Sequence, residues 1–116
     1  MKLLLSLIIF ISMPLHASNK NISYADKKVI KSFVIKVNPT LVAANACLKE
    51  LINKNKPGIQ CESYHTKIAE LNRIYRVISL IDKKKRNHAI ANNNEWYSAF
   101  LLYDKLQFIV MRINDK

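Results

Sequence analysis

The chain has 116 residues, a formal net charge of +11 at neutral pH, two cysteines and a single glycine. This length supports one small domain with one core, and a lone glycine excludes a glycine-rich phosphate loop. The excess of Lys and Arg favours an anionic partner.

The N-terminus has the three parts of a secretory signal peptide. Lys2 precedes an apolar run from Leu3 to Met13, Pro14 breaks the run, and Ala17 supplies the small residue at a cleavage site. The run is too short for a spanning helix of about twenty residues. We predict a signal peptide over residues 1–17, cleaved near Ala17, and a single helical domain over residues 18–116. An uncleaved anchor is the alternative.

The next segment predicts two helices. Ser23 can cap a helix over Tyr24–Val37, with Asp26 in its first turn. Its apolar residues recur at intervals of three and four. Asn38 and Pro39 then predict a break and a second helix over Pro39–Lys54, because Pro is disfavoured in a helix interior. A bend within one near-continuous helix is the alternative at this point.

A turn follows at residues 55–58, which read Asn-Lys-Pro-Gly. We expect residues 58–61 to return in an extended conformation and to lead into a third helix. That helix has a regular apolar stripe of Tyr64, Ile68, Leu71, Tyr75 and Ile78. The run Lys83–Arg86 would close it, where cations complement the negative end of the helix dipole.

A polar connection is expected over residues 87–94, with a fourth helix after it that is capped by Asn92 or Asn94. This last segment is apolar nearly all round, so it is either central in the bundle or exposed to a partner. Its residues 107–113 have strand character, and a short terminal strand is the structural alternative. The predicted fold is therefore all-α: a small four-helix bundle-like domain with one disulfide.

That disulfide joins Cys47 and Cys61, since an even cysteine count in an exported chain indicates a bridge. It closes a loop worth about 3 kcal/mol in the chain-entropy model. A zinc site with His65 would need both thiolates free, so we expect no metal and no cofactor.

The sequence contains no Gly-x-Ser-x-Gly, no Cys-x-x-Cys and no free thiol for a Cys–His pair, so we expect no enzyme. His65 with Asp104 is the one acid–base pair that a small hydrolase reading would use. The candidate partner-binding residues combine cations with aromatic side chains, a composition typical of binding hot spots. They are Lys83, Lys84, Lys85, Arg86, His88, Trp96 and Tyr97.

We predict a small exported, non-catalytic helical binding protein that is periplasmic or secreted. The favoured role is an inhibitor or immunity-type protein acting on an acidic protein partner in the bacterial envelope. The alternative is a cationic protein that binds anionic lipid or cell-wall polymer at the envelope surface. Nucleic acid is not expected in that compartment. A homodimer through the fourth helix is a further expectation, if the apolar circumference of that helix is not fully buried.

Overall fold

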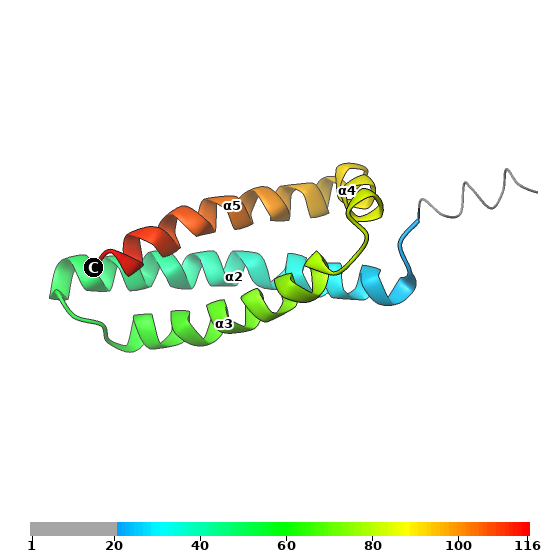
Figure 1. Ribbon diagram of the computed structural model, residues 1–116. Coiled ribbons are helices and arrows are strands. Elements are labelled where there is room, and N and C mark those ends of the chain that lie inside the picture. The colour runs from blue at the N-terminus through cyan, green and yellow to red at the C-terminus, as the bar shows by residue number, and fades with distance from the viewer. Residues whose placement is uncertain (1–20) are drawn as a thin grey trace, which may run out of the picture.

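The structure is a computed structural model that describes residues 21–116. That range contains four α-helices and no strand: α2 (Tyr24–Lys54), α3 (Ile59–Ser79), α4 (Lys83–Ala91) and α5 (Asn94–Asn114) (Figure 1). The predicted all-α class is confirmed. The predicted signal peptide over residues 1–17 lies outside the described residues.

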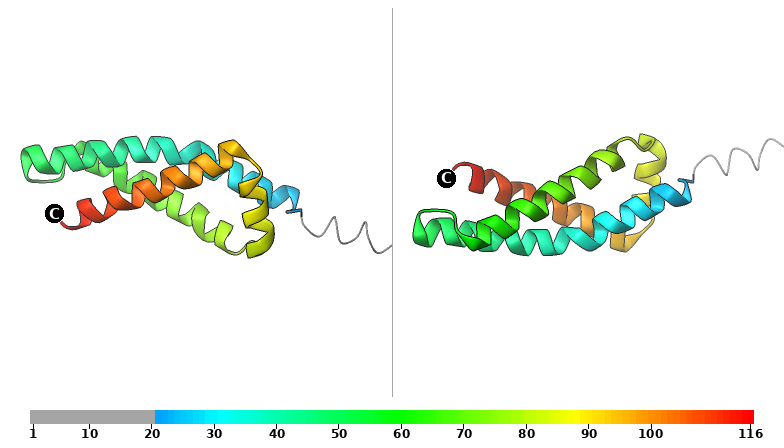
Figure 2. Two further views of the ribbon diagram at one scale, coloured as in Figure 1. Left: turned by 90° about the horizontal axis from the view of Figure 1, so that it is seen from above. Right: turned by 90° about the horizontal axis from the view of Figure 1, so that it is seen from below.

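The three long helices form an up-down-up bundle around α2. α3 runs antiparallel to α2, and the short α4 crosses one end of the bundle before α5 returns along the other side of α2 (Figures 1 and 2). Both α3 and α5 pack mainly against α2. The positions of α3 and α5 are therefore set by α2, whereas α4 packs on α5.

α2 begins as predicted but does not break at Pro39. The Ser23 hydroxyl accepts a hydrogen bond from the N–H of Asp26 at 3.1 Å, so Ser23 is the N-cap. The helix then continues through Pro39 to Lys54. The prediction of two helices is therefore wrong, and the alternative of a near-continuous helix is correct.

Packing explains why the helix continues. A proline in a helix interior costs about 3 kcal/mol, because it removes one hydrogen bond and crowds the preceding turn. Phe33, Val37, Leu41 and Ala44 are buried on one stripe that crosses Pro39 without interruption. Burying each large apolar side chain contributes about 1.5–3 kcal/mol, so the stripe outweighs the proline.

The region around the cations also differs from the prediction. α3 ends at Ser79, and residues 83–91 form the separate helix α4 in place of a helix end and a polar connection. The Asp82 carboxylate accepts a hydrogen bond from the N–H of Lys85 at 3.1 Å and so caps α4. Between α3 and α4, the side chain of Ile81 is buried in the core.

α5 is helical throughout, so the strand alternative for residues 107–113 is wrong. Its N-cap is Asn93, whose Oδ1 accepts from the N–H of Trp96 at 3.1 Å, rather than the expected Asn92 or Asn94. One face of α5 enters the core through Trp96, Ala99, Leu106 and Ile113.

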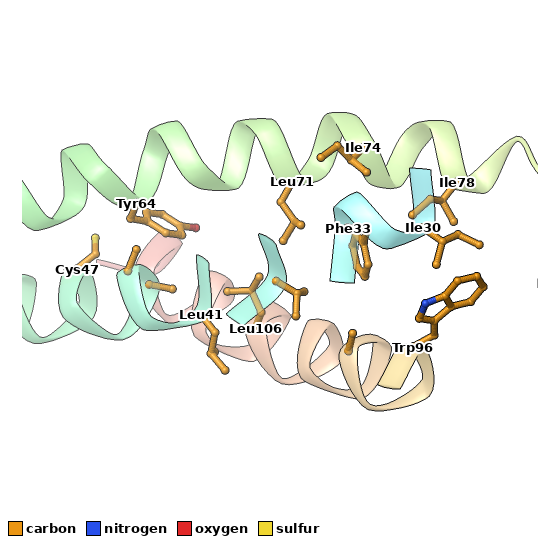
Figure 3. Close-up of a cluster of buried hydrophobic side chains, with 14 of the residues drawn as sticks. Ile30, Phe33, Leu41, Cys47, Tyr64, Leu71, Ile74, Ile78, Trp96 and Leu106 are labelled. Atoms are coloured by element: carbon orange, nitrogen blue, oxygen red, sulfur yellow. The ribbon is translucent and has the colours of Figure 1, made fainter. Parts of the chain in front are cut away.

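An aromatic cluster joins the three long helices at the middle of the core. Phe33 of α2 is fully buried in the core (Figure 3). Its ring centroid lies 4.6 Å from that of Phe100 and 5.2 Å from that of Tyr103. Tyr103 of α5 also stacks on Tyr75 of α3, with centroids 4.5 Å apart. Such aromatic pairs add about 0.5–1.5 kcal/mol each beyond the area they bury.

Two isoleucines of α2 provide a matched test of this packing. Ile30 is 0% exposed and Ile35 is 71% exposed. We expect Ile30→Ala to lower the free energy of unfolding by about 2–5 kcal/mol through lost burial and a cavity. Ile35→Ala should change it by no more than about 0.5 kcal/mol. Urea denaturation followed by circular dichroism measures both, and equal losses would contradict the assigned faces of α2.

Candidate functional site

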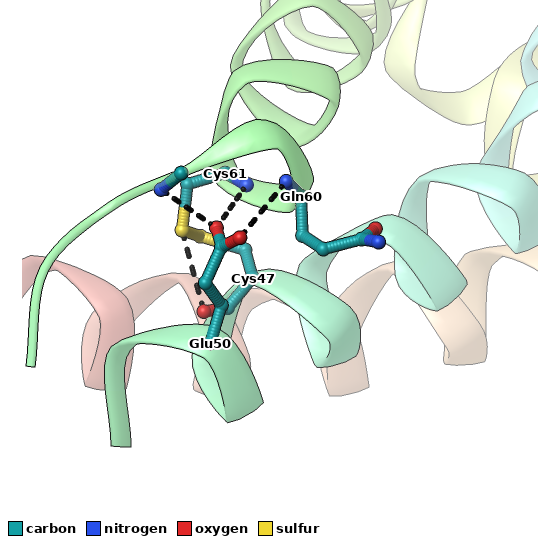
Figure 4. Close-up of a disulfide and its surroundings, with 5 residues drawn as sticks. Cys47, Glu50, Gln60 and Cys61 are labelled. Atoms are coloured by element: carbon teal, nitrogen blue, oxygen red, sulfur yellow. Dashed lines mark hydrogen bonds between the residues drawn. A yellow bond between two sulfur atoms is a disulfide. The ribbon is translucent and has the colours of Figure 1, made fainter. Parts of the chain in front are cut away.

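The α2–α3 hairpin closes through the predicted disulfide. The sulfur atoms of Cys47 and Cys61 lie 2.08 Å apart and their Cα atoms 4.3 Å apart, and both residues are buried (Figure 4). The expectation of an extended return is wrong, since α3 already begins at Ile59. The bond therefore joins the first turn of α3 directly to the last-but-one turn of α2.

A carboxylate beside the disulfide caps α3. Glu50 of α2 is only 6% exposed, and its Oε2 accepts hydrogen bonds from the N–H groups of Cys61 at 2.9 Å and Gly58 at 2.8 Å. Its Oε1 accepts a longer one from the N–H of Gln60 at 3.3 Å (Figure 4). The first N–H groups of a helix have no partner within the helix, and Glu50 supplies one from a different helix.

These contacts set the ionisation of Glu50. Burial by itself would raise the pKa of its carboxyl group, but the N–H groups of Cys61, Gly58 and Gln60 and the charge of Lys54 outweigh burial. The pKa of Glu50 is therefore held below its usual value, and the carboxylate is ionised at neutral pH.

The single glycine is explained by the same carboxylate. A Cβ atom at Gly58 would lie 2.6 Å from Oε1 of Glu50 and 3.0 Å from its Cδ. The backbone at Gly58 has a negative φ of −139°, so left-handed conformation is not the reason for glycine. Glycine lets the Glu50 carboxylate approach the backbone this closely, and a side chain at position 58 would have to displace that carboxylate.

Most of the other acidic residues are placed at helix starts or in a pair. Within residues 21–116 the structure contains one ion pair, in which Nζ of Lys36 lies 2.8 Å from Oε1 of Glu70. The hydrogen bond and charge of Lys36 lower the pKa of Glu70. The first turns of helices or their N-caps hold four others: Asp26, Glu62, Asp82 and Glu95.

The predicted cations lie at the opposite end of the bundle from the disulfide. We call residues 80–88 the cationic corner. Lys83, Lys84 and Lys85 occupy the first turn of α4, and none of them forms an ion pair with another described residue. A helix N-terminus carries partial positive charge, so three cations there oppose the dipole instead of complementing it. The local fold gives no reason for their presence.

Arg86 differs from the three lysines. Its guanidinium donates hydrogen bonds to the carbonyl oxygens of Ile78 and Ile81, each at 3.3 Å. Arg86 therefore bridges the last turn of α3 and the corner residue Ile81. The expectation that the run Lys83–Arg86 closes α3 is wrong, because α3 ends at Ser79 and the run begins α4. Arg86 belongs to the scaffold of the corner more than to its free surface.

The remaining candidates divide between surface and core. His88 is exposed, with Asn92 donating to its backbone carbonyl at 2.7 Å. Tyr97 is exposed, whereas Trp96 is only 8% exposed and packs in the core. Sequence reasoning missed Leu80, which is 85% exposed directly before the lysines. The free surface of the corner is therefore made by Leu80, Lys83, Lys84 and His88, with the half-buried Lys85 beside them.

The structure separates the two residues considered for acid–base chemistry. His65 lines a cavity of about 300 Å³ between the hairpin and the end of α5. Asp104 lines a different hollow on the outer face of α5. Within residues 21–116 no group of three or more His, Cys, Asp or Glu side chains is arranged to hold a metal ion.

Comparison of the chain with protein-family models, with curated proteins and with solved structures finds no match in any of the three. Among the described helices, none is long and apolar enough to cross a membrane. The candidate functional site is therefore the cationic corner.

The contact between Gly58 and Glu50 makes the following prediction. Gly58→Ala should destabilise the wild-type protein by about 1–3 kcal/mol, because the added methyl group displaces the carboxylate that satisfies the buried N–H group of Cys61. In a Glu50→Ala background the same substitution should have a much smaller effect, because the clash is gone. A double-mutant cycle of unfolding free energies measures the coupling, and additive effects would refute the close approach.

Glu50 also predicts a dependence on pH. Its folded-state pKa is below the usual value, so its contribution to stability is present above the unfolded pKa of about 4.5 and is lost as pH falls through the folded pKa. We expect Glu50→Gln to be less stable than wild type at neutral pH and to lose less stability on acidification. Glu62→Gln, on the exposed first turn of α3, is the control that should keep the acid sensitivity of the wild type. Thermal unfolding between neutral and acidic pH distinguishes the two.

Proposed function

We propose that this protein is a non-catalytic binding protein of the inhibitor or immunity type, whose cationic corner docks on an acidic face of a protein partner in the bacterial envelope. The observation that carries the proposal is the placement of three lysines in the first turn of α4. A sequence that breaks a local structural rule with no compensating contact is expected to do so at a functional or strained site.

The chemistry of the corner suits an acidic protein. Lysines without ion-pair partners lose no internal contact when they bind, and they steer an oppositely charged protein toward the surface. Leu80 adds an exposed apolar side chain beside them, and such a side chain can be desolvated by a complementary pocket. Cations would set the rate and orientation of docking, while Leu80 would provide the buried contact.

The scaffold holds this surface in place. Arg86 ties the start of α4 to the end of α3, and Asp82 caps α4 beside the lysines. α4 also packs on α5. A pre-organised surface loses little entropy on binding, which is typical of inhibitors that bind with little change of shape.

A second candidate is binding to anionic lipid or cell-wall polymer at the envelope surface. It is favoured by one observation: the described chain begins at the same end of the bundle as α4 (Figures 1 and 2). If the predicted N-terminal apolar run were retained as an anchor, the cationic corner would lie at the end of the bundle that faces the membrane. Clustered Lys and Arg near an anionic membrane contribute about 1 kcal/mol each.

Charge reversal at the two ends of the bundle tests the proposal. We expect Lys83→Glu with Lys84→Glu to abolish recovery of an acidic protein from envelope extract. Lys49→Glu with Lys56→Glu makes the same change of net charge on exposed residues near the hairpin and should leave recovery unchanged. Affinity capture at low and high salt, followed by mass spectrometry, measures both.

The same proteins are then mixed with vesicles containing anionic lipid and with purified cell wall. Loss of protein capture in the corner variant alone supports the proposal. Equal loss in both variants would show that capture depends only on net charge, and it would overturn the proposal. If the wild type sediments with vesicles or cell wall and captures no protein, the second candidate replaces the first.

A further inference from the structure

A cavity of about 300 Å³ lies where the end of α5 meets the disulfide-closed end of the hairpin (Figure 1). Its apolar wall is formed by the Cys47–Cys61 disulfide, by Leu51 of α2 and by the buried Ile113 of α5. Small-molecule pockets have volumes of about 300–1,000 Å³, so this one is at the lower end of their range. At about 30 Å³ for each water-sized group, the cavity holds about ten such groups. Its size therefore suits a small molecule.

The charged side chains that line this cavity are cations. They are Lys56 and Lys116, and neither forms an ion pair with another described residue. The backbone carbonyl groups of the apolar wall are already bonded: Leu51 accepts from the N–H of Asn55 at 2.9 Å, and Ile113 accepts from the N–H of Lys116 at 3.1 Å. The two ammonium groups are therefore the charges that the cavity offers to a ligand.

Within residues 21–116, no acidic side chain lines the cavity. Glu50 lies beside the disulfide, but both of its carboxylate oxygens accept hydrogen bonds from N–H groups at the start of α3. A cationic ligand would be repelled by Lys56 and Lys116, whereas an anionic group would be attracted by them. The apolar wall favours a hydrocarbon chain on the same ligand, because the chain is then removed from water. The complementary molecule is a small amphiphilic anion.

We propose that this cavity binds a small carboxylate with a short hydrocarbon chain, about ten non-hydrogen atoms in all. The chain lies against the disulfide, Leu51 and Ile113, and the carboxylate lies at Lys56 and Lys116. Such a ligand contacts α2, α3 and α5 at once, so it adds a contact between the hairpin and the end of α5. The proposal is independent of the cationic corner, which lies at the opposite end of the bundle.

Isothermal titration calorimetry of the intact, oxidised protein with octanoate tests the site. We expect one saturable site, and a dissociation constant raised about tenfold or more by Lys56→Gln with Lys116→Gln, which removes both charges. Lys27→Gln with Lys31→Gln makes the same change of net charge on exposed residues near the start of α2 and should leave octanoate binding unchanged. Circular dichroism checks that both variants remain helical.

Related ligands test the two parts of the site separately. Acetate lacks the hydrocarbon chain and octylammonium reverses the charge, so each should bind at least about tenfold more weakly than octanoate. Backbone amide chemical shifts measured by NMR locate the bound molecule, and the largest changes on adding octanoate should fall at Cys61, His65 and Ile113. Amide hydrogen exchange near Ile113 should slow in the complex, because a ligand stabilises the state that binds it.

Four results would overturn the proposal: no binding of octanoate, equal binding by the Lys56 and Lys116 variant, equal binding of octylammonium, or shift changes that fall mainly outside the cavity. Tighter binding of a short acetylated peptide that ends in leucine would assign the cavity to the C-terminus of a protein, and it would overturn the proposal too. The variant with Lys83→Glu and Lys84→Glu should still bind octanoate, so failure of this proposal is distinguishable from failure of docking at the cationic corner.

Discussion

The arrangement of this bundle depends on the contact between the Glu50 carboxylate and the start of α3. Three features act on the same few atoms: the disulfide brings the two helices together, Gly58 leaves room for the carboxylate, and Glu50 satisfies the N–H groups that α3 cannot satisfy itself. A change in any one disturbs the other two. The direction of α3 is set at this point, and with about 1.5 Å of rise per residue a small change of angle there moves the distant cationic corner by several ångströms.

Much of the fold could be predicted from local patterns, and the errors have identifiable physical causes. Ser23 is an N-cap because its hydroxyl lies in the place that the first turn of α2 requires, which a sequence displays directly. Pro39 misled the prediction because its local cost is visible in the sequence, whereas the buried stripe that outweighs it depends on packing with α3 and α5. Asp82 before the lysines was a usable signal for a new helix, but the cations were assigned to the end of α3 instead.

The amino-acid composition indicates where the candidate site lies, and the burial of individual side chains shows which of its residues are on the surface. Lys83 and Lys84 are exposed, as a charge run would suggest, and Lys85 is half-buried. Trp96 packs in the core, and Arg86 donates a hydrogen bond to the end of α3. Glu50 could not have been recognised as a cap, because it lies eight residues before Gly58 and across a turn, where no helical periodicity relates them. The sequence also showed that α5 is apolar nearly all round. Only the packed structure distinguishes the core face of α5 from its exposed outer face.

The central position of α2 has a consequence for how the molecule opens. The disulfide joins α2 to α3, whereas α5 is held against α2 by side-chain packing without a covalent link. Proteins open in cooperative units, and the unit with the fewest constraints opens at the lowest free energy. In this bundle that unit is α4 with α5, whose detachment leaves the oxidised hairpin closed. Amide hydrogen exchange would then be faster in α5 than in α2.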